Sequence, residues 1–376
     1  MNSKISEVFD QVITFKVSER EKSKIIKKIK SKYESKSEAK FKFIDLFAGI
    51  GGLRTGFEFN GGECVFSSEW DKYAQQTYFC NYGEFPNGDI TKVALNEIPK
   101  HDVLLAGFPC QAFSVAGERK GFEDTRGTLF FDVARILESK NPSSFLLENV
   151  KGLLNHDGGQ TFRVIIETLE QLNYEVHYKV LNTMDYGNTP QTRERLYIVG
   201  FHKSKVKVRG FEFPIKKKLT KTISDVLDHA KQDDYFYYNR FDIYPTLKKE
   251  ILKKDTVYQW RRVYTRENKS NVCPTLTANM GTGGHNVPLI KDDYGIRKLT
   301  PRECARFQGF PENFYIPAFM ANSHLYKQFG NSVSVPVVKA ISACIVEVLE
   351  KNKVSHAKVK KKSSLPAGSD LQKQLL

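Results

Sequence analysis

The order of apolar and polar positions between residues 41 and 201 predicts short buried strands that alternate with amphipathic helices. Short aliphatic and β-branched runs are typical of buried strands, whereas apolar residues three or four positions apart are typical of a helix face. Strands are predicted at 41–47, 64–68, 101–106, 144–147, 175–181 and 196–201, and helices at 53–57, 130–137 and 162–172. This alternation indicates an α/β fold, in which helices cover both faces of a largely parallel sheet.

The alternation stops near residue 208 and resumes near residue 300. Residues 201–296 hold nineteen Lys and Arg against eleven acidic residues, together with a dense group of aromatic residues. Such a segment suits a nucleic-acid-binding module, although aromatic residues in a small domain more often form its core. A capping box, Thr300-Pro-Arg-Glu303, then begins a helix, and an apolar stripe at 338–348 predicts the last one.

These changes of pattern divide the chain into five predicted parts. They are a basic helical N-terminal extension at 1–41, an α/β domain at 42–207, an irregular module at 208–300, a return to the α/β domain at 301–350, and a disordered tail at 351–376. In the extension, an apolar stripe through Ile25, Ile26 and Ile29 favours a solvated helix docked on the body. A DNA or dimer contact made by its lysines is the alternative.

Charge and cysteine content narrow the class of protein. The chain has 376 residues, with 58 Lys and Arg against 43 Asp and Glu, so its formal net charge is +15. This excess suits a polyanionic partner such as nucleic acid, although basic charge also keeps a protein soluble. No stretch approaches the ~20 apolar residues of a membrane span, and the polar start Met-Asn-Ser-Lys is unlike a signal peptide. The six cysteines show no Cys-x-x-Cys spacing, so we predict a reducing, cytosolic or nuclear compartment, no disulfide framework and no metal site.

A glycine-rich turn separates the first predicted strand from the first helix that follows it. Residues 48–52, read Ala-Gly-Ile-Gly-Gly, allow the backbone to approach a ligand and direct helix-start amides toward it. Glu69 ends the next strand eighteen residues beyond Gly51, about where nucleotide-binding sheets place a carboxylate for ribose hydroxyls. Trp70 offers an aromatic face, and Asp89 a second acidic group at the end of a further predicted strand. Because the third glycine of Gly-x-Gly-x-x-Gly is missing, an adenosine ligand other than a nicotinamide dinucleotide fits best.

Reactive side chains follow two strands that we expect to end at one edge of the sheet. Cys110 lies in Gly-Phe-Pro-Cys-Gln-Ala-Phe-Ser directly after one strand, and Glu148 closes another. Ligands bind at this edge of open α/β sheets, so the thiol is a candidate nucleophile and the carboxyl group a candidate general acid. The alternatives are a buried apolar thiol and a solvated carboxylate. Arg193 and Arg195 alternate on an extended segment, so both can hold an anion or a carboxylate.

These segments together resemble the DNA cytosine-5 methyltransferases, most closely the compact bacterial restriction-modification type. Eight blocks occur in the family's order between residue 41 and about residue 350: Phe47-Ala-Gly-Ile-Gly51, Glu69-Trp70, Gly88-Asp-Ile90, Pro109-Cys-Gln111, Glu148-Asn-Val150, Gln191-Thr-Arg-Glu-Arg195, 297–311 and 328–332. The resemblance implies a Rossmann-like S-adenosylmethionine-dependent methyltransferase sheet with helices on both faces. Residues 42–207 and 301–350 would form this catalytic domain, and 208–300 a smaller irregular target-recognition domain.

The resemblance also implies a reaction and a role for each motif. The enzyme would methylate carbon 5 of a cytosine within a specific short duplex DNA sequence, by base flipping and a covalent adduct between Cys110 and cytosine carbon 6. Catalysis would involve Cys110, Glu148, Arg193 and Arg195; S-adenosylmethionine would contact Phe47, Gly49, Gly51, Glu69, Trp70, Asp89, Ile90, Pro109, Asn331 and Ser332; DNA would contact Gln111, Ser114, Arg126 and Thr275. The glycine-studded segment 114–127 would be a lid over the flipped base.

The resemblance further implies a cytoplasmic bacterial monomer whose partners are double-stranded DNA and S-adenosylmethionine, without a membrane. A cognate restriction endonuclease would act on the same site without direct contact. One alternative is an RNA cytosine-5 methyltransferase of the same fold, although the tRNA-modifying members carry Pro-Pro-Cys where this chain has Phe108-Pro-Cys110. Another is a DNA-binding protein that has lost catalysis or that regulates transcription through residues 1–41. The sequence leaves open the DNA recognition site and the base that removes the carbon 5 proton.

Overall fold

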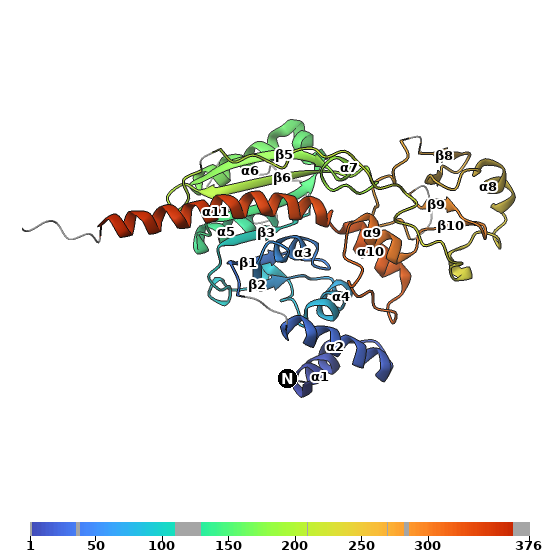
Figure 1. Cartoon of the computed structure of the whole chain (residues 1–376), viewed down its shortest axis with the longest axis horizontal. Coiled ribbons are helices and arrows are strands. Elements are labelled where there is room, and N and C mark those ends of the chain that lie inside the picture. The colour runs from blue at the N-terminus through green and yellow to red at the C-terminus, as the bar shows by residue number, and fades with distance from the viewer. Residues whose placement is uncertain are drawn as a thin grey trace, which may run out of the picture.

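The central element of the fold is a six-stranded sheet in the order β2-β1-β3-β4-β6-β5 (Figure 1). The computed structural model describes residues 2–34, 38–109, 129–208, 210–268, 270–281 and 286–363, with side chains between residues 5 and 352. The strands of this sheet are β1 (Phe41–Leu46), β2 (Gly62–Ser68), β3 (Val103–Ala106), β4 (Ser144–Val150), β5 (Tyr174–Asn182) and β6 (Glu194–His202). Strands β1 to β4 are parallel, and β6 runs antiparallel to both of its neighbours.

The middle strand β3 is buried along its whole length, as expected of a strand covered on both faces. Its alternate residues face two different cores, with Val103 and Leu105 in one and Leu104 and Ala106 in the other. The strand order places β1 between β2 and β3, so the chain crosses to the other side of β1 after β2. Ligands of open α/β sheets bind at such a switch point, beyond the carboxyl ends of the strands.

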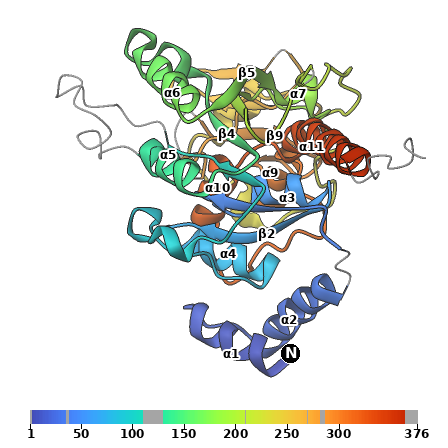
Figure 2. The ribbon, with the colours of Figure 1, turned by 90° about the vertical axis from the view of Figure 1, so that its left-hand side faces the viewer.

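Helices cover both faces of this sheet, which confirms the predicted α/β class (Figure 2). One face carries α3 (Gly52–Glu58), α7 (Thr183–Tyr186) and α11 (Val335–Ser363), and the other carries α5 (Leu129–Lys140) and α6 (Gln160–Gln171). The remaining helices of this part are α4 (Lys72–Tyr82), α9 (Pro301–Phe307) and α10 (Asn322–Asn331), with short 3-10 helices η1 (Ile90–Lys92), η2 (Leu95–Glu97) and η3 (Lys151–Gly159). The predicted capping box of α9 is formed, because Thr300 and Glu303 bond to each other's backbone amides.

The last helix, α11, is longer than the sequence pattern predicts. The prediction of a disordered tail from residue 351 is wrong for 351–363, which are helical, while 364–376 lie outside the described residues. Residues 351–363 contain neither glycine nor proline, so nothing in them interrupts a helix that the core has already nucleated. By length and composition the stretch Asn322–Asn352 could cross a membrane, but 61% of its most apolar window is buried inside the protein. It therefore behaves as a core helix.

A second, smaller sheet lies beyond α9 and α10 and gives the 208–300 segment more order than the sequence predicts (Figure 1). It is antiparallel, in the order β10-β9-β7-β8, and consists of β7 (Tyr258–Trp260), β8 (Thr265–Glu267), β9 (Pro288–Lys291) and β10 (Ile296–Lys298), with η4 (Asp234–Phe236) and α8 (Tyr244–Glu250) nearby in the chain. Tyr258 is 1% exposed in a core that Trp260 and Tyr244 also contact. These three aromatic residues therefore serve the core, as the alternative interpretation predicted, whereas Phe241 and Tyr264 are exposed.

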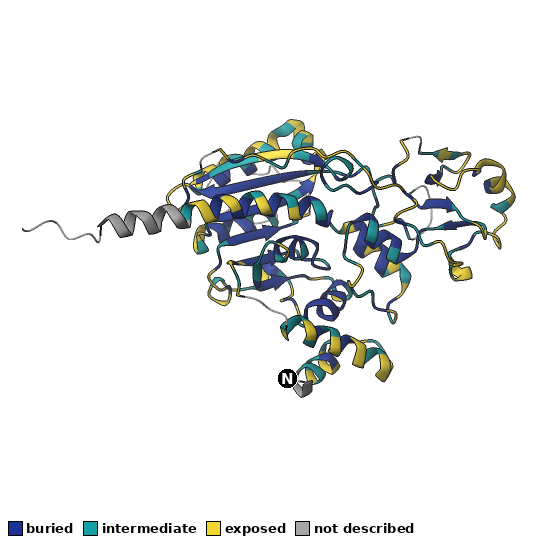
Figure 3. Cartoon of the chain, viewed as in Figure 1, coloured by how far each residue is buried: buried dark blue, intermediate teal, exposed yellow. Residues whose placement is uncertain are grey.

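The N-terminal extension forms two helices, α1 (Asn2–Val12) and α2 (Glu19–Glu34), that pack on α4. Ile25 and Ile29 are fully buried in a cluster that includes Phe79 and Cys80 of α4. Exposed residues alternate with this buried stripe along α2 (Figure 3). The preferred prediction, a helix docked by its apolar stripe, is confirmed.

One core residue conflicts with its apolar surroundings and gives the fold a predictable pH dependence. Asp45 of β1 is fully buried, and among the described residues its carboxyl oxygens have no hydrogen-bond partner of ordinary geometry. Burial raises the pKa of Asp45 well above its usual value, against the opposing influence of the Arg54 charge. The folded protein therefore keeps a proton that the unfolded chain releases, so the free energy of unfolding falls as pH rises above the ordinary aspartate pKa.

We expect Asp45→Asn to remove this loss of stability. Over the affected interval one retained proton changes the free energy of unfolding by about 1.4 kcal/mol per pH unit. Urea unfolding of both proteins should show that the free energy of unfolding of the variant, relative to that of the wild type, is larger at pH 8 than at pH 5. Parallel pH dependences would mean that Asp45 ionises as an ordinary aspartate in the folded protein.

Candidate active site

A cavity of about 680 Å³ opens at the carboxyl ends of the four parallel strands. Its walls include Phe47 after β1, Glu69 after β2, Pro109 after β3 and Glu148 near the end of β4. Residues from the end of α10 and just after it complete the cavity from a distant part of the chain. The cavity therefore lies at the switch point between β1 and β3, and its volume is typical of a small-molecule site.

The glycine-rich turn forms one wall of the cavity, but the two glycines predicted to contact the cofactor have different surroundings. Gly49 has a φ of +54°, and a Cβ added there would meet no atom within 4 Å, so its backbone faces open space. Gly51 does not line the cavity. Its φ is +84° and an added Cβ would lie 2.4 Å from the Tyr82 ring, so glycine is required there by packing. Gly51 therefore has a structural role at the start of α3, and its predicted contact with a cofactor stays a prediction.

Glu69 is held in a fixed orientation beneath this turn. One carboxylate oxygen accepts a hydrogen bond from the Gly49 amide at 2.7 Å, and the other accepts from the Asp71 amide at 2.8 Å. Burial raises the pKa of Glu69, and these two amides partly offset the rise. Beside it, the Trp70 side chain is 81% exposed and lines the cavity. A fixed carboxylate next to an open indole face is suited to a ribose and a flat heterocycle.

Asp89 and Ile90 also line the cavity, but they do not end a strand as predicted. Asp89 instead caps η1, where its carboxylate accepts hydrogen bonds from the Thr91 hydroxyl and amide. These bonds lower the pKa of Asp89, so it is a stable anion at the cavity rim. The predicted strand before Asp89 is not formed. This part of the chain pairs with β2 only through a single bridge between Ser68 and Asn87.

The wall opposite the glycine turn comes from residues 327–333. Asn331 ends α10 and Ser332 follows it, and both line the cavity. A Cβ at Gly52 would lie 2.7 Å from the Ser332 hydroxyl oxygen, so only glycine lets this segment close on α3. An ion pair of 2.7 Å between Lys327 and Asp71, both cavity residues, ties α10 to the start of α4. Gly52 and this ion pair are features that the sequence did not single out.

Glu148 and Arg195 face each other across the adjoining strands β4 and β6. The Arg195 Nε lies 3.2 Å from a Glu148 carboxylate oxygen, and the two side chains are 15% and 12% exposed. Burial raises the pKa of Glu148, while the charges of Arg195 and Arg193 oppose the rise. A nearly buried carboxyl group with a raised pKa retains its proton closer to neutral pH, as a general acid requires.

Arg193 has a different environment from the one predicted. Its guanidinium donates hydrogen bonds to the backbone carbonyls of Leu276 at 2.8 Å and Gly330 at 3.2 Å, and also to that of Ser332. Burial lowers the pKa of Arg193 to about 9. Its contacts join β6 to the second module and to the segment after α10. Arg193 also lines the cavity, so these contacts suit it to positioning the cavity wall, and its predicted part in catalysis stays a prediction.

The chain that leads to the predicted nucleophile is anchored by Asn149, which belongs to a block noted in the sequence but to which the sequence assigned no role. Asn149 is 3% exposed and donates a hydrogen bond of 2.9 Å to the Phe108 carbonyl, beside the cavity residue Pro109. Cys110, Gln111, Ser114 and Arg126, and the predicted lid at 114–127, lie outside the described residues. Thr275 is half-buried and donates to the Thr192 carbonyl at 2.6 Å, so its hydroxyl proton is already used within the protein.

Comparison with known proteins connects this geometry to a family. Residues 41–347 match the family described as C-5 cytosine-specific DNA methylase. The type II methyltransferase M.Bsp6I of Bacillus sp. (strain RFL6) is 53% identical over 303 residues, which are 79% of this chain and 96% of that protein. M.HhaI of Haemophilus parahaemolyticus is 44% identical over 315 residues, 80% of this chain and 93% of that protein.

Solved structures give the same fold. The S. pombe Dnmt2 methyltransferase superposes with a TM-score of 0.64 at 20% identity, covering 83% of this chain and 99% of that one. A putative DNA modification methyltransferase of an E. coli prophage gives a TM-score of 0.60 at 22% identity, covering 82% and 99%. These likenesses, at low identity, concern the fold alone. Because the family match spans most of the chain and the eight motifs occur in order, this protein belongs to the C-5 cytosine-specific DNA methylase family and is a DNA cytosine-5 methyltransferase.

Proposed function

We propose that the protein methylates carbon 5 of a cytosine within a specific short duplex DNA sequence, using S-adenosylmethionine. The observation that carries this proposal is the position of the Glu148–Arg195 pair in the same cavity as the glycine turn and Glu69. One part of the cavity offers groups suited to a nucleoside, and the adjoining part offers an acid next to a fixed cation. A methyl donor and an acceptor base would thus meet in one enclosed space.

The cofactor half of the cavity fits S-adenosylmethionine. The open backbone at Gly49 leaves room for the ligand, and the Glu69 carboxylate keeps lone pairs for ribose hydroxyls beyond those used by backbone amides. Trp70 would cover the adenine, and the anionic Asp89 would accept from its amino group. Asn331 and Ser332 would close the far side. When bound, the cofactor supplies an electrophilic methyl group on a sulfonium.

The acceptor half of the cavity would activate the cytosine. Carbon 5 is too weak a nucleophile until a thiolate adds to carbon 6, and we assign this addition to Cys110. The five described cysteines are unsuited to the task, because burial raises the pKa of each thiol. Glu148 would give its proton to ring nitrogen 3 as the bond forms, and Arg195 would hold the Glu148 carboxyl group in place.

A cytosine within a duplex must leave the base stack to enter this cavity. Base flipping costs a few kcal/mol, which contacts to the flanking DNA must offset. The 208–300 module, with its basic excess, would supply such contacts as the target-recognition domain. Its connection to Arg193 through Leu276 supports a fixed relation between this module and the cavity.

The relatives suggest the biological setting. M.Bsp6I and M.HhaI are named type II methyltransferases, and the chain covers more than nine-tenths of each. We therefore place this protein in the cytoplasm of a bacterium as the modification enzyme of a restriction-modification system. It would act as a monomer and would protect sites that a cognate endonuclease cuts, without needing to touch that enzyme.

The proposed activity can be tested together with its target. Duplex DNA incubated with the purified protein and S-adenosylmethionine should show protected cytosines after bisulfite treatment, all within one short recurring sequence. Transfer of label from the cofactor to tRNA, with none to duplex DNA, would contradict the proposal and favour an RNA methyltransferase. Omission of the cofactor is the matched control.

A further inference from the structure

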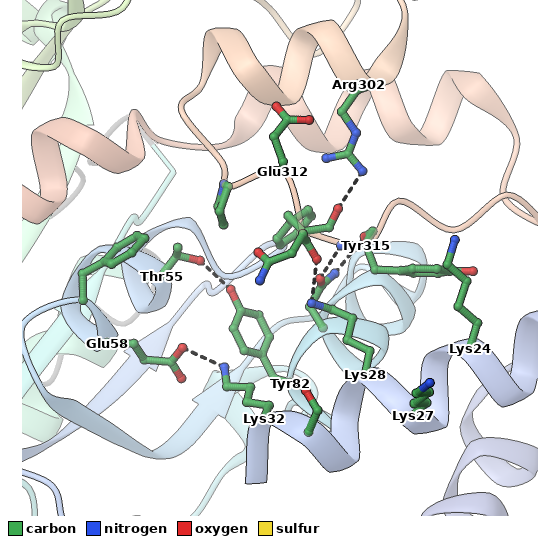
Figure 4. Close-up of a pocket in the computed structure, with 16 residues that line it drawn as sticks. Lys24, Lys27, Lys28, Lys32, Thr55, Glu58, Tyr82, Arg302, Glu312 and Tyr315 are labelled. Carbon is green, nitrogen blue, oxygen red and sulfur yellow. Dashed lines mark hydrogen bonds and ion pairs between the residues drawn. The ribbon is translucent and has the colours of Figure 1, made fainter. Parts of the chain in front are cut away.

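The helix α2 inserts two polar side chains into the body of the enzyme in addition to its apolar stripe. Lys32 Nζ donates a hydrogen bond of 2.7 Å to the Glu58 carboxylate and lies 4.1 Å from the centroid of the Tyr82 ring (Figure 4). The Tyr33 hydroxyl lies 3.4 Å from both the Tyr82 carbonyl oxygen and the Glu84 carboxylate. Burial lowers the pKa of Lys32 to about 8, although the Glu58 charge opposes this.

The same two carboxylates hold a buried arginine of the catalytic domain. Arg54 of α3 is 3% exposed, and its guanidinium donates to Glu58 at 2.7 Å and to Glu84 at 2.7 Å. The guanidinium carbon lies 4.2 Å from the centroid of the Tyr82 ring. Lys32 from the extension and Arg54 from the catalytic domain therefore both lie against the Tyr82 ring. Both also bond to the Glu58 carboxylate.

Tyr82 in turn is bonded to the glycine turn of the cavity. Its hydroxyl donates to the Gly51 carbonyl at 2.9 Å. The same hydroxyl lies 2.7 Å from the Thr55 hydroxyl (Figure 4). Burial raises the pKa of Tyr82, so the phenol remains a donor at all working pH values. Because Gly51 also packs directly on the ring, the position of Tyr82 fixes the start of α3 and the turn before it.

The catalytic domain is shaped to receive α2. Gly83, directly after Tyr82, has a φ of +71°, and a Cβ added there would lie 2.4 Å from Ile29 and 3.1 Å from Tyr33. A side chain at this position would force Ile29 to move. The positive φ itself belongs to the left-handed C-cap of α4, where the Gly83 amide donates to the Phe79 carbonyl.

We propose that the N-terminal extension supports the cofactor site from outside the cavity, because Lys32 of α2 holds Tyr82 of α4 and both act as positioning residues for the turn at 47–51. This inference rests on the proposed role of that turn in binding S-adenosylmethionine. Loss of either side chain would leave the turn less ordered in the free enzyme. The cofactor would then have to order it on binding, so cofactor affinity would fall while the chemical step in the saturated complex stayed unchanged.

Titration calorimetry with S-adenosylmethionine and full-length protein tests the inference. We expect Tyr82→Phe, which removes only the hydroxyl, and Lys32→Met each to weaken cofactor binding about five-fold, the usual effect of one hydrogen bond. Lys32→Arg should restore most of the affinity. The control is Lys22→Met, which breaks an ion pair of 2.6 Å with Asp10 inside the extension and should leave binding unchanged. The KM for the cofactor should rise, whereas kcat and the Kd for DNA should not.

Three outcomes are distinguishable in this experiment. Unchanged cofactor affinity in Tyr82→Phe and Lys32→Met would overturn the inference. Equal losses of cofactor and DNA affinity would also overturn it, since they would indicate general damage to the fold. Absence of binding by the wild-type protein would instead remove the proposed function itself, whatever the variants do.

Discussion

Glu148→Gln is expected to lower kcat by roughly 10²- to 10⁴-fold, the usual contribution of a positioned general acid. Glutamine has almost the same shape but cannot give a proton to ring nitrogen 3. Binding of DNA and of S-adenosylmethionine should persist, because Glu148 lies in the acceptor half of the cavity. The measurement is the rate of methyl incorporation at saturating cofactor and DNA.

The pH dependence distinguishes an acid from a merely structural carboxylate. Burial raises the pKa of Glu148, so its proton remains bound at a pH where an ordinary glutamate has lost it. The wild-type rate should therefore fall as pH rises through this raised pKa, and this decline should be absent from the variant. Glu194→Gln is the matched control, since Glu194, on the neighbouring strand β6, forms an exposed ion pair of 3.0 Å with Lys151. A kcat within a few-fold of wild type in Glu148→Gln would refute the assignment.

Cys110→Ala is expected to abolish methyl transfer, with a loss of at least about 10³-fold, because removing a covalent nucleophile removes the whole activation of the base. Specific DNA binding should remain. An oligonucleotide that carries 5-fluorocytosine at the target position should become covalently trapped on the wild-type enzyme in the presence of cofactor, and should not be trapped on the variant.

Cys344→Ala serves as the control for this experiment. Cys344 is partly exposed on α11, and burial raises the pKa of its thiol, so it should make no covalent bond with the base. The variant should methylate and trap DNA as the wild type does. Residual methylation by Cys110→Ala, or trapping on a different cysteine, would contradict the proposed nucleophile.

Local patterns predicted the elements that meet at the cavity. Apolar runs located β1, β3 and β4, and the rule that ligands bind at the carboxyl ends of parallel strands predicted Glu148 at this edge of the sheet. The structure places Glu148 in the same cavity as Glu69. The spacing of Arg193 and Arg195 likewise indicated a pair of cations on one extended segment. Only Arg195 of the two contacts the Glu148 carboxylate.

The features that could not be predicted depend on contacts between distant parts of the chain. Arg193 bonds to Leu276 and Gly330, which lie 83 and 137 residues away, and no local spacing signals such partners. The requirement for glycine at position 51 comes from a ring 31 residues further on, so the motif suggested a ligand contact where packing is the cause. The burial of Asp45 could not be predicted, because it lies within an apolar run and the raised pKa of its carboxyl group depends on how deeply the fold buries it.

The cofactor cavity draws one wall from residues 47–90 and the other from residues 327–333. When synthesis has reached only the end of β6, the large sheet is complete but one wall of the cavity has not yet been made. Premature termination anywhere between β6 and α10 will yield a product without methyl-transfer capacity, however well its sheet folds. Newly made enzyme consequently gains a complete cavity only after α10 has been synthesised and the residues after it close against Gly52.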